Sequence, residues 1–265
     1  MSDTESVLLT QDQEAVRVLT LNRPKARNCL SMDLMTSLRS AVADAEDNES
    51  VRAVVLTGAG PAFSSGHDLK ELTAHRNDPD RGHAFYAETM RTCAELMLAI
   101  VRLPKPVVAA VNGIATAAGC QLVATCDLAV AATDARFATP RVNIGLFCST
   151  PMVALSRNVS RKAAMEMLLL GEMISADDAL KLGLLNRVVP ADQVLNEAVA
   201  FGRTIASKPS RTLKIGKEAF YRQAEMPLDE AYLYTAEVMV NNMLDSESVE
   251  GIGAFLDKRA PQWPR

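Results

Sequence analysis

The chain has 265 residues, of which 48% are apolar and 23% are charged, with a net charge of −4 at pH 7. This composition is that of an ordinary globular protein, and its acidic balance offers no basic footprint for nucleic acid. No apolar run reaches the ~18 residues of a membrane span, and the acidic start of the sequence is typical of neither a signal nor a transit peptide, so we expect a cytoplasmic protein.

The first half of the chain alternates strands and helices. Apolar periodicity predicts strands over 15–21, 52–57, 107–111 and 128–132, and helices over 32–47, 84–101 and 116–124. Ser31 is expected to cap the first helix. The polar segment 74–83 is expected to be a mobile connection. This order implies crossover connections and a mostly parallel sheet covered by helices.

The second half is predicted to be nearly all helical. Ser160 and Ser175 have the form of helix caps. Further helices are predicted over 192–207, 211–223, 228–244 and 248–258. We therefore divide the chain into a core over 1–200 and a C-terminal helical region over 201–265 that packs on a neighbouring subunit.

The cysteines and histidines of the sequence argue against disulfide bonds and against a metal site. The cysteines are odd in number and lack Cys-x-x-Cys spacing, so we expect buried, reduced thiols. They are Cys29, Cys93, Cys120, Cys126 and Cys148. The three histidines show no ligand spacing, and we expect no metal site.

Two glycine-containing turns are the candidate site. Ser64–Asp68 follows a predicted strand, and Thr116–Gly119 begins a predicted helix. Free N–H groups at a helix start favour negative charge, and a second N–H converging from another loop would complete a two-donor oxyanion hole. Taken alone, these residues are equally the turns of any α/β protein.

Longer motifs in the chain resemble the crotonase, or enoyl-CoA hydratase/isomerase, superfamily. Residues 63–71 (FSSGHDLKE) resemble its acyl-CoA loop, and 105–113 (KPVVAAVNG) with 119–120 and 126–129 resemble its second loop and helix. Further matches at 21–25, 176–189 and 253–259 follow in the family's order.

The resemblance implies an α/β fold, a crotonase-like ββα spiral with a C-terminal helical trimerisation region. It implies a homotrimer or hexamer (a dimer of trimers) that binds a coenzyme A thioester as substrate and needs no separate cofactor. The backbone N–H groups of His67 and Ala118 would hold the thioester carbonyl. Coenzyme A contacts would come from Lys25, Ser65, Asp68, Leu69 and Lys70, although the two lysines could equally be solvated surface residues.

The sequence departs from the family's hydratases at both catalytic glutamates. Gln121 follows the intact Gly119-Cys120 pair, and Arg141 follows the intact Phe137–Pro140 segment. An amide cannot accept a proton from water at neutral pH, and a guanidinium has no acceptor. Each lost acid–base group typically removes ~10²–10⁴ in rate. We therefore expect weak or altered hydratase activity, and 113–123 with 147–151 indeed resembles a hydratase-like branch that lacks both glutamates.

Other roles stay open at this point. His67 and 142–145 also resemble the methylmalonyl-CoA decarboxylase branch, although that branch has a tyrosine roughly where Cys148 stands; His67 could instead contribute only its backbone N–H. Arg141 could bind a substrate carboxylate or, more simply, pair with a protein acid. Cys148 is interpreted as pocket lining and Asp127 as structural. A non-catalytic acyl-CoA-binding subunit is the remaining alternative.

Overall fold

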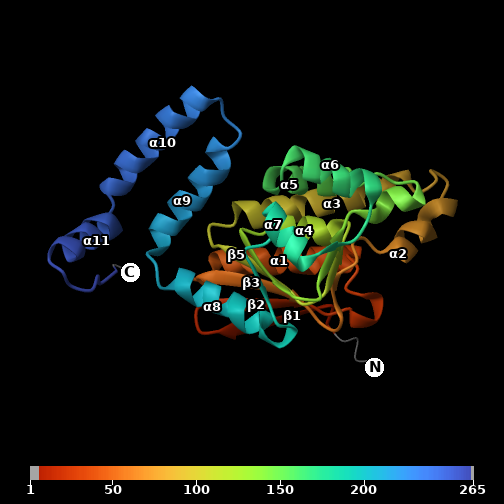
Figure 1. The fold of residues 1–265 in the computed structure, drawn as a ribbon, viewed down its shortest axis with the longest axis horizontal. Coiled ribbons are helices and arrows are strands. Elements are labelled where there is room, and N and C mark those ends of the chain that lie inside the picture. The colour runs from red at the N-terminus through yellow and green to blue at the C-terminus, as the bar shows by residue number, and fades with distance from the viewer. Residues whose placement is uncertain (1–5, 264–265) are drawn as a thin grey trace.

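A six-stranded sheet forms the base of the molecule in the computed structural model, which describes residues 6–263 (Figure 1). Its strands follow the order β1-β2-β3-β5-β7-β10, and every neighbouring pair is parallel except β1 with β2. The strands are β1 (Leu8–Gln13), β2 (Val16–Leu21), β3 (Ala53–Gly58), β5 (Val107–Val111), β7 (Leu128–Ala132) and β10 (Arg187–Val189). The predicted mostly parallel α/β sheet is confirmed.

A second, four-stranded sheet follows the order β4-β6-β8-β9. Its strands are β4 (Ala62–Ser64), β6 (Ile114–Thr116), β8 (Arg136–Ala138) and β9 (Ile174–Ser175). β4, β6 and β8 each come a few residues after a strand of the large sheet, and helical structure follows each of them. The chain therefore climbs in strand–strand–helix turns, which is the expected crotonase-like spiral.

Helices cover both sheets. α8 packs against β2, β3, β5 and β7 of the large sheet, while α1 packs against β1, β2 and α3. Ser31, Ser160 and Ser175 cap α1, α6 and α7 through their side chains, as predicted. The helices of the body are α1 (Met32–Asp47), α2 (Leu69–Ala74), α3 (His83–Arg102), α4 (Ala118–Thr125), α5 (Pro151–Asn158), α6 (Arg161–Leu170), α7 (Ala176–Leu182) and α8 (Val194–Ala206). Short 3₁₀ turns are η1 (Pro24–Ala26), η2 (His75–Asn77), η3 (Pro140–Ile144) and η4 (Ala191–Gln193).

The connection at 74–83 has more regular structure than the sequence suggests. It contains η2 and a turn in which the Asp80 carboxylate accepts the amides of Gly82 and Ala84, at 3.0 and 2.8 Å. The His75 ring stacks on Phe85 with 3.8 Å between centroids. The polar residues of this segment make turn and helix-capping hydrogen bonds. These bonds give the segment a defined path although its composition is typical of loops.

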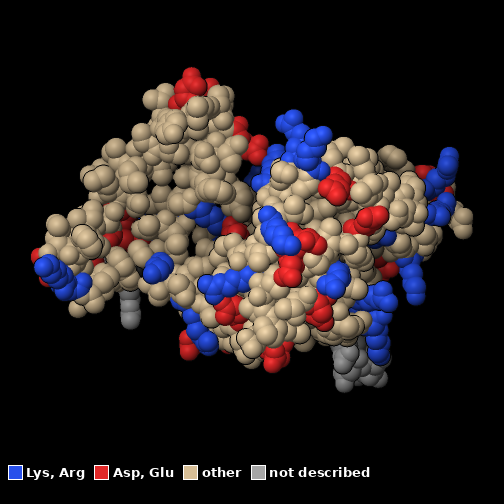
Figure 2. All heavy atoms as spheres, viewed as in Figure 1, with Lys and Arg blue, Asp and Glu red and all other residues tan. Residues whose placement is uncertain are grey.

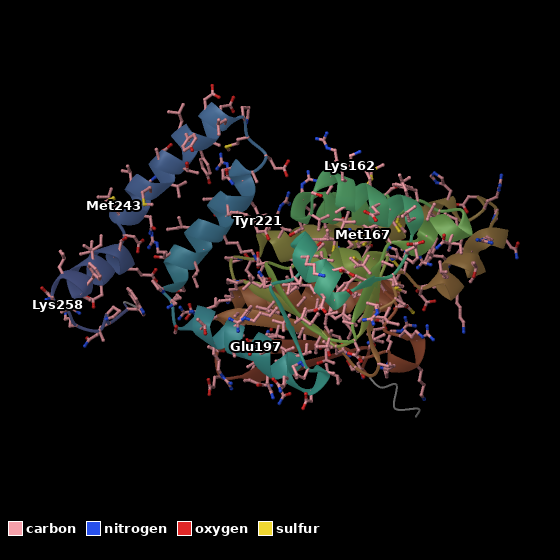
Figure 3. The ribbon with its side chains drawn as sticks, viewed as in Figure 1. Lys162, Met167, Glu197, Tyr221, Met243 and Lys258 are labelled. Carbon is pink, nitrogen blue, oxygen red and sulfur yellow. The ribbon has the colours of Figure 1, made fainter. Side chains whose placement is uncertain are left out.

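Three helices extend away from the body (Figure 1): α9 (Ser210–Gln223), α10 (Leu228–Met243) and α11 (Ser246–Leu256). Figure 3 shows Met243 far from the body, whereas Tyr221 of α9 lies beside the body. Large apolar side chains are exposed on these helices, among them Leu228, Tyr232, Leu233, Val249 and Phe255. The predicted division at residue 200 falls inside α8, which packs on the sheet, and the extended helices begin at Ser210. The division into two regions itself stays a prediction.

Two further features follow from the described residues. The five cysteines are all free and buried, as predicted. Between residues 6 and 263, no helix is both long and apolar enough to cross a bilayer.

Candidate active site

The loop after β4 lies directly against the start of α4, and two glycines permit this approach. A Cβ built on Gly66 (φ +84°) would lie 3.0 Å from the amide nitrogen of Ala118. A Cβ on Gly119 would lie 2.1 Å from the carbonyl oxygen of Ser64, which is closer than any real side chain allows. The two turns named from the sequence therefore meet in space, and any side chain at either glycine would separate them.

The turn before α1 holds the β4 loop in place. The Ser65 amide donates to the Arg27 carbonyl at 3.0 Å, and the Ser64 hydroxyl donates to the Asn28 carbonyl at 2.9 Å. Leu30 then pairs with the loop like a strand, because its amide donates to Gly66 O at 2.8 Å. Sequence reasoning missed this support. Asn28 is its centre, with a buried side-chain amide that donates to the Ala59 and Ala62 carbonyls.

The amides of His67 and Ala118 belong to the two segments that meet at this junction. Within residues 6–263, neither amide donates to a carbonyl or side chain of the protein. Ala117, which precedes α4, has φ 51° and ψ −119°, a conformation that disfavours a side chain. The Ala117 amide donates to the Ala138 carbonyl at 2.9 Å. Backbone strain of this kind is typical of functional sites, where it directs a group that regular helix geometry would not present.

The His67 ring is largely buried and neutral. Neither ring nitrogen has a hydrogen-bond partner among the described residues. Burial, with a smaller contribution from the Arg141 charge, lowers the pKa of His67 to about 4. At pH 7 the imidazole therefore carries one N–H donor and one free acceptor nitrogen.

Arg141 lies on η3, and its side chain extends to the backbone of His67. Its Nη2 donates to the His67 carbonyl at 3.3 Å, and burial lowers its pKa. No acidic side chain of the described chain forms an ion pair with it. The simpler expectation, an ion pair with a protein acid, is therefore wrong. Its neighbours include instead the neutral His67 residue and the buried Cys148, and burial raises the pKa of the Cys148 thiol. This agrees with a lining role for Cys148.

Gln121 lies one turn into α4 and is 5% exposed, and its Oε1 is buried without a partner. It also borders a cleft of about 1230 Å³ between the body and α9, with apolar walls from Val101, Val153 and Phe220. An unpaired buried amide oxygen beside a cleft is a position where a ligand or water would find an acceptor.

Asp127 ties α9 to this part of the body. Its carboxylate accepts Lys217 Nζ at 2.7 Å, the Tyr221 hydroxyl at 2.8 Å and the Val107 amide at 2.7 Å. Figure 3 shows Tyr221 where α9 lies beside the body. Burial and the Asp127 charge raise the pKa of Tyr221. Asp127 is thus structural in this chain, as the sequence suggested.

The predicted coenzyme A contacts lie around the β4 loop, but they differ in their availability. Asp68 is already engaged: its carboxylate caps α2 through the Lys70 amide at 3.1 Å and pairs with Arg23 Nη2 at 3.0 Å. The backbone of Asp68 is engaged as well, because its amide donates to the Leu30 carbonyl at 3.2 Å and its carbonyl accepts the Leu72 amide at 3.0 Å. Arg23 itself was not predicted.

The remaining predicted contacts are accessible. Lys25 on η1 and Lys70 on α2 are exposed, and neither has an acidic partner among residues 6–263. Ser65 is half-buried and Leu69 is 37% exposed. Figure 2 shows basic side chains gathered at the lower right of the molecule, the end where Figure 1 draws α2. The described side chains contain no group of three or more potential metal ligands, and the absence of a resident metal or cofactor stays an expectation.

Fold and site together define a crotonase-type α/β protein, and comparison with known proteins agrees. The profile of the enoyl-CoA hydratase/isomerase family matches residues 11–265, and the chain belongs to this family, within the crotonase superfamily. Binding of an acyl-CoA substrate is a general property of the family.

Relatives are similar over nearly the whole chain. The enoyl-CoA hydratase domain-containing protein 3, mitochondrial, of Rattus norvegicus is 46% identical and covers 96% of this chain and 83% of its own. The probable enoyl-CoA hydratase echA8 of Mycobacterium tuberculosis is 35% identical, covering 98% of both chains. A solved enoyl-CoA hydratase of Mycobacterium smegmatis has 52% identity and a TM-score of 0.92, covering 98% of this chain and 99% of that one. The human domain-containing protein 3 has 46% identity and a TM-score of 0.92, covering 97% and 100%.

These names overturn one expectation. The rat and human relatives are called mitochondrial, which contradicts the cytoplasmic location inferred from the start of the sequence. That inference was weak physically, because a targeting segment is recognised separately and contributes nothing to the folded core.

Proposed function

We propose that this protein is an acyl-CoA-binding enzyme whose backbone oxyanion hole, formed by the amides of His67 and Ala118, stabilises a thioester enolate. The observation that supports the proposal is the close approach of Gly66 to the Ala118 amide nitrogen, together with the lack of a protein acceptor for the His67 and Ala118 amides among residues 6–263. An enolate carries its negative charge on the former carbonyl oxygen. Loss of a single donor from such a hole typically costs about 10²–10³ in rate.

The nominal hydratase reaction is expected to be weak. Hydration needs a base that removes a proton from water and an acid that protonates the α-carbon. Gln121 supplies an unpaired amide oxygen and Arg141 a permanent cation, and neither can exchange a proton at neutral pH. The hydratase names belong to relatives, and this chain keeps the binding half of their site.

Binding and assembly form the rest of the proposal. Lys25 and Lys70 would contact the phosphates of coenzyme A, with Ser65, Asp68 and Leu69 along the loop. The thioester is the substrate, and no separate cofactor is required. The exposed apolar faces of α9–α11 support a homotrimer or a hexamer made of two trimers.

The His67 ring favours a second candidate, decarboxylation of a malonyl-type thioester. The carboxylate would leave as CO₂, the electrons of the broken C–C bond would form the enolate held by the two amides, and a proton from water would then add to the α-carbon. This reaction needs no base to create the enolate. The supporting observation is the neutral, unpartnered imidazole beside the hole.

The decisive experiment follows products by mass spectrometry after the protein is mixed with crotonyl-CoA, 3-hydroxybutyryl-CoA or methylmalonyl-CoA. We expect saturable binding of all three and crotonyl-CoA turnover at least 10²-fold below an ordinary hydratase. The variant with both Gln121→Glu and Arg141→Glu should gain hydration, whereas each single variant should gain little. Turnover of crotonyl-CoA by the unaltered protein at ordinary hydratase rates would refute the weak-hydratase proposal. CO₂ release would favour the second candidate, and binding without any product would indicate a non-catalytic subunit.

A further inference from the structure

Among the residues that the structure describes, Arg141 is a cation without a counter-ion, and it lies beside the proposed oxyanion hole. Its only side-chain hydrogen bond within residues 6–263 goes to a neutral acceptor, the His67 carbonyl, at 3.3 Å. The side chain is half-buried, and the residues that follow it include the exposed apolar Ile144, Leu146 and Phe147. A partly desolvated guanidinium is costly to leave unpaired, so the site favours an anion from outside the chain.

Resting on the proposed function, we infer that Arg141 binds a carboxylate at the end of the acyl chain, so that the substrates are short dicarboxylic acyl-CoA thioesters. A guanidinium holds a carboxylate through two parallel hydrogen bonds, which no neutral acyl group can accept. Arg141 thus acts as a residue that determines specificity at the position where hydratases of the family carry a glutamate.

The geometry limits the chain length. Arg141 Nη2 lies 3.3 Å from the carbonyl oxygen of His67. Three bonds of ordinary length join that oxygen to the amide nitrogen of the same residue, so the guanidinium lies within roughly 7.5 Å of the proposed oxyanion donor. A thioester oxygen on that donor and a carboxylate on Arg141 each add a hydrogen bond of about 3 Å, so a single acyl group reaches both, and we take the short succinyl and glutaryl groups as the expected fit.

An ion pair between Arg141 and a substrate carboxylate disfavours decarboxylation of that carboxylate. A carboxylate bound to a guanidinium is stabilised as an anion, and that stabilisation opposes loss of CO₂. The carboxylate on Arg141 is accordingly one that the reaction retains, distant from the reacting carbons.

The test compares succinyl-CoA with butyryl-CoA, which has the same chain length and no carboxylate, by isothermal titration calorimetry. A charge-assisted pair predicts that succinyl-CoA binds about 10- to 100-fold more tightly. This preference should fall as salt is raised. Arg141→Gln removes the charge and should abolish the preference, so that succinyl-CoA and butyryl-CoA bind this variant with similar affinities. Arg141→Lys should retain part of it, because the charge remains.

Arg136→Gln is the matched control, since Arg136 is an exposed arginine on β8 that donates only to the Ala135 carbonyl among the described residues. It should leave the preference intact. Equal binding of the two thioesters by the unaltered protein, or a preference that survives Arg141→Gln, would overturn the carboxylate inference while leaving the proposed function in place. If neither thioester bound, both the carboxylate inference and the proposed function would be overturned.

Discussion

Replacement of Gly119 by alanine tests whether the contact between the β4 loop and α4 builds the site. The added Cβ would lie 2.1 Å from the Ser64 carbonyl oxygen, and 2.8 and 2.9 Å from two further Ser64 atoms. The two segments would have to separate by about 1 Å or more to reach an ordinary contact. Backbone atoms form the obstacle, so no side-chain rotation can relieve it.

Two losses should follow. Overpacking of this kind costs about 1–3 kcal/mol of unfolding free energy, which lowers Tm by roughly 2–12 °C in a chain of this size. The separation also moves the His67 and Ala118 amides off a shared oxygen. Two hydrogen bonds of about 0.5–1.5 kcal/mol each correspond to a rise in Kd of roughly 5- to 150-fold.

The assay is thermal unfolding followed by calorimetric titration with butyryl-CoA well below Tm. Gly216→Ala in α9 is the control, because a Cβ at Gly216 meets no atom within 4 Å. That variant should gain about 0.5–1 kcal/mol, since alanine is the better helix former, and should bind normally. A Gly119→Ala protein with unchanged Tm and Kd would refute the close contact. Lost stability with an unchanged Kd would separate the contact from ligand binding.

Two further predictions concern charge in the body of the protein. Lys217→Met removes the 2.7 Å partner of Asp127 at a side chain that is 7% exposed, and should cost about 3–5 kcal/mol in urea unfolding. As a control, Lys181→Met breaks an exposed ion pair with Asp178 and should cost less than about 1 kcal/mol of unfolding free energy. Equal losses in the two variants would contradict a stabilising role for the buried pair of Lys217 with Asp127. The His67 signal should titrate near pH 4 by NMR, because burial favours the neutral ring. The unfolded chain gains this proton near pH 6.5 and the folded chain does not, so unfolding free energy should fall by up to about 3 kcal/mol as pH drops from 6.5 to 4. His67→Gln should remove this dependence, and a native midpoint near 6.5 would show that the ring is solvated.

Elements with a strong local signal were predicted closely. β5 and β7 begin and end at the expected residues, and the Ser31 side chain accepts the Leu34 amide as a helix cap should. The second sheet was not predicted, because its strands have two or three residues and show no periodicity. β1 was missed because its solvent-facing side chains resemble those of a polar terminus.

The candidate site, too, was predicted from the sequence only in part. Residue type alone identified Gln121 and Arg141 as groups unable to exchange protons, since that follows from amide and guanidinium chemistry in any environment. It could not identify Arg23 or Asn28, whose roles depend on neighbours distant in the chain. Nor could it show that Asp68 is already occupied by a helix cap and an ion pair.

The amino-acid sequence by itself therefore determined the family and the order of the strand–helix turns, and its resemblance to the family predicts that Gln121 and Arg141 stand in place of both glutamates. Only the tertiary structure decided that the β4 loop meets the start of α4, that the amides of His67 and Ala118 have no acceptor in the described chain, that the His67 ring is neutral, and that Arg141 has no acidic partner there. The physical reason is that the identity of a side chain is local. Burial, unsatisfied donors and the balance of charge are properties of the neighbours that folding assembles around it.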